Sequence, residues 1–281
     1  MVLADMFESR VRRLVAGGGL CILLFGLVWA LACGVTGRRV LAPIDGAILD
    51  GLFRLRAPSL DRLMMGLSAL GDGIIRTPAV VLIVGYLLWR RRWLWVAGLL
   101  AATSGAAILT PMLKTALHIE RPTPIYAGAS AFSFPSGHTT AAAALYIVLA
   151  WIASRSAAPK TRFVPWSLAA VMILLTGVSR IYLGAHWPSD VLAGFALGAA
   201  LGIVGVMIAG GRHPESSREP RPGPSHGAPI LACLIIVGCV AGPAAYGKAV
   251  RLYGPYLRDG LMVDRASHIE PATHQRHDER P

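Results

Sequence analysis

The chain has 281 residues, of which 54% are hydrophobic and only 15% are charged. Soluble domains carry about 25% charged residues, so this composition excludes an ordinary soluble protein, a disordered chain and a collagen-like one. The net charge of +12 would suggest nucleic acid as the partner of a soluble protein. Here the arginines gather at the ends of apolar runs, where they meet lipid headgroups, so we expect a lipid bilayer and no nucleic acid as partner.

Seven apolar runs approach the length of about 20 residues that a helix needs to cross a bilayer. The predicted spans are Leu14–Val35, Gly71–Trp89, Trp93–Met112, Ser136–Ser154, Phe163–Ser179, Val191–Gly211 and Ala228–Gly247. Residues 41–55 carry an apolar helical stripe that is too short to span, and we expect it to lie on the outer surface. The expected fold class is therefore all-α, a polytopic transmembrane helical bundle.

Two further segments are expected to lie outside the bundle. Residues 212–227 are rich in Pro, Ser and Gly, which predicts a flexible cytoplasmic connector. Residues 248–281 are expected to form a polar tail, and its His268, His274 and His277 are interpreted as solvated side chains. The four cysteines all lie in apolar runs without CxxC spacing, so neither a zinc site nor a disulfide framework is expected.

The distribution of basic residues predicts the orientation of the bundle. With the N-terminus in the cytoplasm, every inside connection is basic, for example at Arg10–Arg13 and Arg90–Arg92, as the positive-inside rule requires. This orientation places the loop Leu113–Pro135 and the junction Arg180–Asp190 on the same outer face. We therefore expect a multi-pass protein of the inner (cytoplasmic) membrane whose functional face looks toward the periplasm or the exterior.

Ionisable residues at membrane depth are costly, about 2.5 to 3.5 kcal/mol each at a helix centre, so they mark candidate functional sites. Three clusters lie at the outer ends of predicted spans: Lys114-x6-Arg121-Pro122, Pro135-Ser136-Gly137-His138, and Ser179-Arg180-x5-His186-x3-Asp190. The cations Lys114, Arg121 and Arg180 would together neutralise a phosphate, although each alone would more often be a snorkelling interfacial side chain. Ser136 and Gly137 stand where a helix begins, a position that favours an anion but is also an ordinary cap.

His186 and Asp190 are four residues apart, so a helix would place them on one face. A carboxylate that binds one ring nitrogen leaves the lone pair of the other nitrogen available, which makes the imidazole a nucleophile or a base. The simpler alternative is a histidine beside a capping aspartate. His138 would be the matching acid, delivered from a neighbouring helix.

The combination of the three clusters resembles the signature of the type-2 phosphatidic acid phosphatase superfamily, also called lipid phosphate phosphatases. Every signature position is present between Lys114 and Asp190. The resemblance implies a six-span phosphatase core, residues 1–211, followed by an extra C-terminal transmembrane helix, residues 228–247. It implies that His186 attacks phosphorus to form a phosphohistidine while Asp190 orients the ring. His138 would act as acid and then as base, without a metal or other cofactor.

The resemblance also assigns the phosphate-binding groups and the class of substrate. The implied phosphate-binding residues are Lys114, Arg121, Ser136, Gly137 and Arg180. The implied activity is hydrolysis of a lipid phosphate or diphosphate of the undecaprenyl diphosphate, phosphatidic acid or phosphatidylglycerol phosphate type, with undecaprenyl diphosphate favoured. The alternatives are a lipid phosphotransferase that uses the same intermediate, and a non-catalytic lipid-binding or transport protein. No feature of the sequence indicates an oligomeric state.

Overall fold

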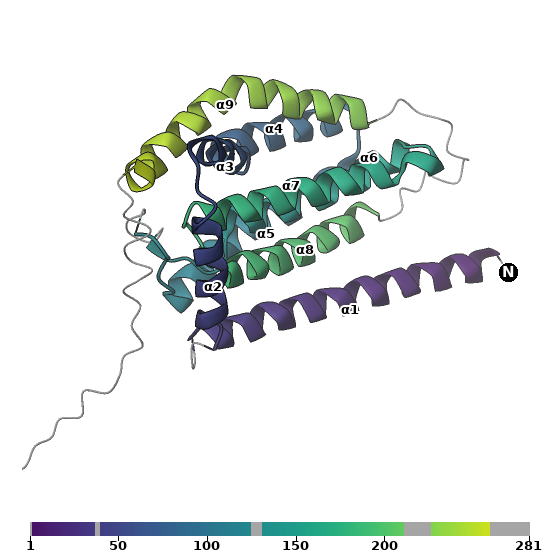
Figure 1. The fold of residues 1–281 in the computed structure, drawn as a ribbon. Coiled ribbons are helices and arrows are strands. Elements are labelled where there is room, and N and C mark those ends of the chain that lie inside the picture. Colours follow the sequence, from purple (N-terminus) through teal and green to yellow (C-terminus); the bar gives the residue numbers. More distant parts are fainter. Residues whose placement is uncertain (1, 37–39, 125–130, 211–225, 259–281) are drawn as a thin grey trace, which may run out of the picture.

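The computed structural model of the protein describes residues 2–36, 40–124, 131–210 and 226–258 (Figure 1). These ranges contain the helices α1 (Val2–Thr36), α2 (Ala42–Phe53), α3 (Pro58–Leu70), α4 (Gly73–Trp89), α5 (Trp93–Leu117), α6 (Gly137–Ser156), α7 (Phe163–Tyr182), α8 (Pro188–Ala209) and α9 (Gly227–Arg258), with a short 3₁₀ turn η2 (Pro159–Thr161). Seven stretches of helix among them are long and apolar enough to cross a membrane. The expected all-α transmembrane bundle is therefore confirmed.

The arrangement of the helices places α6, α7 and α8 in the middle of the bundle (Figure 1). Helix α1 packs along α8 on one flank, and α9 packs against α3 and α4 on the other. Helix α2 lies across one end of the bundle (Figure 1). This position agrees with the prediction that residues 41–55 form a surface helix that does not span the membrane. The clusters that carry the candidate chemistry all lie toward this end.

The second predicted span, Gly71–Trp89, corresponds to α4. A helix that the sequence did not predict, α3, ends just before it, and the chain is broken at Gly71 and Asp72 between the two. The Asp72 side chain accepts a hydrogen bond of 2.9 Å from the Ile74 backbone N–H and so caps the start of α4. A capping carboxylate satisfies an N–H group that the helix leaves unpaired. Asp72, the carboxylate near the start of the predicted span, is therefore the N-cap of α4.

The last helix continues to Arg258, where the sequence predicted an end at Gly247. Its continuation is amphipathic, and the buried side chains of Ala249 and Tyr253 pack with Met65 of α3 and Tyr182 of α7. Apolar contacts of this kind stabilise a helix that has no long apolar run of its own. The predicted connector residues 212–225 and the three tail histidines lie outside the described residues.

Close packing in the centre depends on small residues along α8. A Cβ atom on Gly198 would collide with the backbone oxygen of Thr140 in α6, and one on Gly194 would lie 2.8 Å from the Ser136 oxygen. Such small-residue stripes let two transmembrane backbones approach each other. The first turns of α6 and α8, which carry His138 and Asp190, are therefore held side by side.

We expect Gly198→Ala to lower the free energy of unfolding by about 1 to 3 kcal/mol, because an overpacked interface must shift its backbone. The measurement is the midpoint of thermal unfolding in detergent. Gly238→Ala on α9 is the control, since a Cβ there has nothing within 4 Å. Equal midpoints for Gly198→Ala and the unmodified protein would contradict a close contact between α6 and α8.

Candidate active site

The three clusters come together at the end of the bundle that α2 crosses. Lys114 lies in the last turn of α5 and Arg180 in the last turn of α7, while Ser136 precedes α6. The Ser136 backbone N–H donates to the Asp190 backbone oxygen at 3.0 Å, which joins the second cluster to the third. The structure thus brings together residues that lie up to 76 positions apart between Lys114 and Asp190.

The turn between α7 and α8 presents His186. It contains Gly184 with a φ of 64°, a left-handed conformation that glycine adopts without strain. Pro188 then opens α8, where its fixed φ suits a first helical turn. The Asp190 carboxylate accepts a 2.9 Å hydrogen bond from the Trp187 backbone N–H, which fixes the carboxylate at the start of the helix.

His186 and Asp190 form a buried pair. The His186 Nδ1 lies 3.4 Å from Asp190 Oδ2, and the two residues are 1% and 0% exposed. The other ring nitrogen, Nε2, lies 3.1 Å from the Arg121 guanidinium. Because a guanidinium can only donate, Nε2 accepts this bond, and the ring proton of a neutral imidazole sits on Nδ1, facing the carboxylate.

The surroundings of His186 keep its ring neutral. Burial lowers the pKa of His186 well below its usual value, and the positive charges of Arg121, Lys114 and Arg180 lower it further. A neutral ring retains a lone pair on Nε2, which a nucleophile requires.

Each of the three cations is held in place by protein oxygens. The Lys114 ammonium donates to the backbone oxygens of Phe132 and Ser133 at 2.6 and 2.9 Å. Arg121 donates to the Ala185 backbone oxygen, and Arg180, which is 1% exposed, donates to the hydroxyls of Ser68 and Tyr253. Fixed cations of this kind stabilise an anion without first having to be ordered.

The first turn of α6 supplies the remaining predicted site residues. Ser136 is buried, and its hydroxyl accepts a 3.0 Å hydrogen bond from Thr139. Gly137 is the first residue of α6, at the positive end of the helix dipole. His138 follows, and its Nε2 lies 3.8 Å from Asp72 Oδ2.

Sequence analysis missed three residues that contact the predicted ones, and a fourth, Lys248, that contacts one of these three. Asp72 faces His138 and also accepts a 2.8 Å hydrogen bond from Lys248 of α9, while Ser68 and Tyr253 bind Arg180. Only Asp72 carried a signal, namely a carboxylate close to the start of an apolar run. Among the described residues, no three His, Cys, Asp or Glu side chains are grouped closely enough to hold a metal ion.

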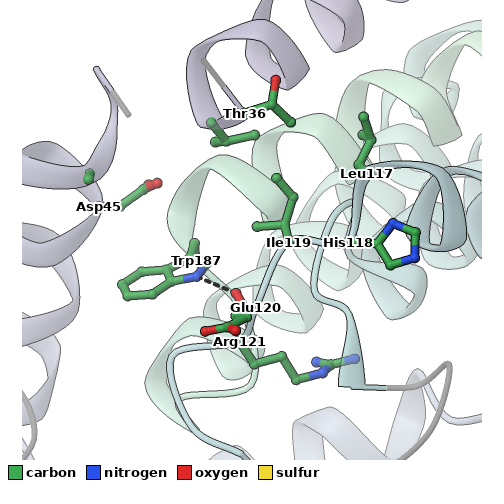
Figure 2. Close-up of a pocket in the computed structure, with 10 residues that line it drawn as sticks. Thr36, Asp45, Leu117, His118, Ile119, Glu120, Arg121 and Trp187 are labelled. Atoms are coloured by element: carbon green, nitrogen blue, oxygen red, sulfur yellow. Dashed lines mark hydrogen bonds between the residues drawn. The ribbon is translucent and has the colours of Figure 1, made fainter. Parts of the chain in front are cut away.

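A cavity of about 390 Å³ lies beside these residues, between the α1–α2 corner and the loop after α5 (Figure 2). Its lining is Val35, Thr36, Ala42, Asp45, Leu117, His118, Ile119, Glu120, Arg121 and Trp187. The Trp187 indole donates to the Glu120 backbone oxygen at 2.9 Å and so ties the loop to the start of α8. Arg121 belongs both to this lining and to the contacts of His186.

Comparison with known proteins places the chain in a family. The model of the PAP2 superfamily matches residues 93–213. The chain is 34% identical over 186 residues to phosphatidylglycerophosphatase B of Bacillus subtilis, an alignment that covers 64% of this chain and 89% of that protein. The chain belongs to the PAP2 superfamily.

Two further similar proteins agree with this assignment. The decaprenylphosphoryl-5-phosphoribose phosphatase of Mycobacterium tuberculosis is 28% identical over 188 residues, which are 64% of this chain and 94% of that protein. The crystal structure of a transmembrane PAP2 type phosphatidylglycerolphosphate phosphatase from Bacillus subtilis matches with a TM-score of 0.59 and 30% identity, over 66% of this chain and 94% of the other. This PAP2 protein is therefore a multi-pass membrane lipid phosphatase, and its matched region contains all eight predicted site residues.

Proposed function

We propose that the chain hydrolyses a phosphate or diphosphate ester of a membrane lipid through a phosphohistidine on His186, without a metal. The observation that carries this proposal is the environment of the His186 ring. Asp190 lies beside Nδ1, Arg121 binds Nε2, and Lys114, Arg180 and His138 act on the same ring electrostatically. A buried neutral imidazole among fixed cations suits attack on a phosphate.

In the first step, a substrate phosphate replaces the Arg121 contact at Nε2. The Nε2 lone pair forms a bond to phosphorus, and the bond between phosphorus and the ester oxygen breaks in line with it. The electron pair leaves on the ester oxygen, which takes a proton from His138. Asp190 stabilises the positive charge that His186 acquires.

In the second step, His138 accepts a proton from a water molecule that attacks phosphorus. The bond to Nε2 breaks, its electron pair returns to His186, and inorganic phosphate is released. In both steps, cations and the start of α6 hold the equatorial oxygens of the phosphoryl group. Negative charge accumulates on these oxygens in the transition state. The groups in this role are Lys114, Arg121, Ser136, Gly137 and Arg180.

The choice among lipid substrates rests on the relatives. Phosphatidylglycerol phosphate ranks first, because the relative with 34% identity and the solved structure with 30% identity are both named for acting on it. Undecaprenyl diphosphate, which sequence analysis favoured, and phosphatidic acid follow. All three present a terminal phosphate on an apolar anchor, which the proposed site would accept from within a bilayer.

We further propose an inner-membrane location with the site facing the periplasm or the exterior. The support is the basic connection between α4 and α5, which contains Arg90, Arg91 and Arg92. Trp89 and Trp95 lie beneath Arg90 and Arg92 with ring contacts of 5.8 and 5.0 Å, as in an interfacial anchor. The same proposal keeps residues 1–211 as the phosphatase core and treats α9 as an addition to it.

The test is a phosphate-release panel in detergent with EDTA present, across phosphatidylglycerol phosphate, undecaprenyl diphosphate and phosphatidic acid. We expect free phosphate from at least one of them at a rate that EDTA does not change, because a histidine nucleophile needs no metal to be activated. Activity lost in EDTA and restored by a divalent ion would contradict the metal-free mechanism. Phosphate that appears only on a second lipid would instead indicate a phosphotransferase.

A further inference from the structure

Helix α9 lies beyond residue 213, where the family match ends, yet it contacts the candidate active site at three places. Lys248 binds Asp72, Tyr253 binds Arg180, and the Tyr256 hydroxyl donates to the backbone oxygen of Pro124 at 3.1 Å. The first contact reaches the carboxylate that faces His138, and the second reaches Arg180 of the third cluster. The third contact reaches the loop that carries Arg121. A helix that served only as an additional membrane anchor would not need polar contacts in this place.

The contact of Lys248 acts through Asp72, whose two carboxylate oxygens have different partners. Oδ1 accepts the Ile74 N–H and caps α4, whereas Oδ2 lies 2.8 Å from the Lys248 ammonium and 3.8 Å from His138 Nε2. The Lys248 side chain is 49% exposed, and an ion pair that water reaches so freely stabilises a fold very little. Its clearest effect is to fix the orientation of the oxygen that faces His138.

The contact of Tyr253 acts on Arg180 inside the protein. Arg180 and Tyr253 are each 1% exposed, and Ser68 of α3 binds the same guanidinium nitrogen. The Tyr253 ring also lies 5.5 Å from the centre of the guanidinium, within cation–π distance. An arginine that is held by a hydroxyl from each of two helices has little freedom to turn away from a bound phosphate.

We propose that α9 is part of the active site. Lys248 positions the acid His138 through Asp72, and Tyr253 positions the phosphate-binding Arg180. This proposal rests on the function proposed above, in which His138 protonates the leaving group. It identifies both α9 residues as positioning residues that do not themselves touch the substrate.

The experiment for Lys248 compares kcat/KM for decyl phosphate and 4-nitrophenyl phosphate. Nitrophenolate leaves without a proton, whereas an alkoxide requires one. Weaker acid catalysis therefore lowers kcat/KM only for the alkyl ester. We expect Lys248→Met to lower kcat/KM for decyl phosphate about tenfold, a fraction of the about 10² to 10⁴ that an acid–base group contributes, with little change for the aryl ester. Lys248→Arg should restore the alkyl activity, and Arg251→Met, which removes an exposed cation from the same helix, is the matched control.

The experiment for Tyr253 uses both esters and orthovanadate, which mimics the five-coordinate phosphorus of the transition state. We expect Tyr253→Phe to lower kcat/KM about tenfold for both esters and to weaken vanadate inhibition by a similar factor, as the loss of a hydrogen bond to a charged group does. Tyr246→Phe removes a hydroxyl from the same helix and should change neither value. Thermal midpoints are measured for every variant.

Different results separate the two proposals. If His138→Ala lowers kcat/KM selectively for the alkyl ester and Lys248→Met does not, the role of Lys248 is overturned while the proposed function stands. kcat/KM covers the steps up to formation of the phosphoenzyme, so the later base role of His138 does not enter it. If His138→Ala lowers kcat/KM equally for both esters, the acid role of His138 is wrong, and the role of Lys248 is wrong with it. If Tyr253→Phe lowers kcat/KM without weakening vanadate inhibition, Tyr253 does not position Arg180.

Discussion

Replacing His186 with alanine is expected to lower kcat by about 10⁶-fold, the size of the loss when the nucleophile of a covalent mechanism is removed. The variant lacks the Nε2 lone pair that would take the phosphoryl group, while the cations that bind the phosphate remain. The measurement is phosphate release from phosphatidylglycerol phosphate. A second measurement traps the enzyme with ³²P-labelled substrate and looks for an acid-labile, alkali-stable phosphoenzyme.

The matched comparison for this prediction is His138→Ala. This variant retains the nucleophile and lacks the base that activates water, so it should accumulate the phosphoenzyme that His186→Ala cannot form. 4-Nitrophenyl phosphate is the labelled substrate for the comparison, because its leaving group needs no proton. Unchanged phosphate release by a folded His186→Ala protein would eliminate the phosphohistidine.

The second large effect is expected from Asp190→Asn, with a fall in kcat of about 10⁴-fold. Asparagine retains the size of the side chain and can still accept the Trp187 backbone N–H bond, which is 2.9 Å long in the structure. It lacks the negative charge that offsets a phosphorylated, positively charged His186. Substrate binding, judged by inhibition with a non-hydrolysable phosphonate lipid, should change far less than kcat.

Asp61→Asn is the control for this substitution. Asp61 lies on α3 and accepts a 2.7 Å hydrogen bond from the Tyr182 hydroxyl, and it makes no contact with His186 among the described interactions. We expect its kcat to stay close to that of the unmodified protein. If Asp61→Asn and Asp190→Asn lose activity to the same extent, the effect reflects the fold and not the charge beside the imidazole.

The sequence predicted the parts of the site that depend on local spacing. His186 and Asp190 meet because four residues separate them at the start of a helix, and apolar runs of membrane length predicted the helices that carry Lys114 and Arg180. The grouping of these residues at one end followed from counting spans between basic loops. These features can be predicted without knowing which helices are neighbours.

The contacts that sequence analysis missed depend on which helices pack together. Asp72 and Lys248 are 176 residues apart, and Arg180 and Tyr253 are 73 apart. No periodicity along the chain indicates that α9 lies against α3 and α4. Helix α3 was equally hidden, because its 13 residues are too few to span a bilayer and include Asp61 and Arg62.

The break between α3 and α4 has a consequence for how a lipid reaches the catalytic groups. Backbone that leaves a helix at membrane depth is tolerated only where protein shields it from hydrocarbon. Helix α9 packs on both α3 and α4 and provides that shield, so it closes this flank of the bundle. The 390 Å³ cavity lies at the corner of α1 and α2, and none of its lining residues belongs to α9. Under the function proposed above, we therefore expect the apolar chain of the substrate to approach the catalytic groups on the side of α1 and α2.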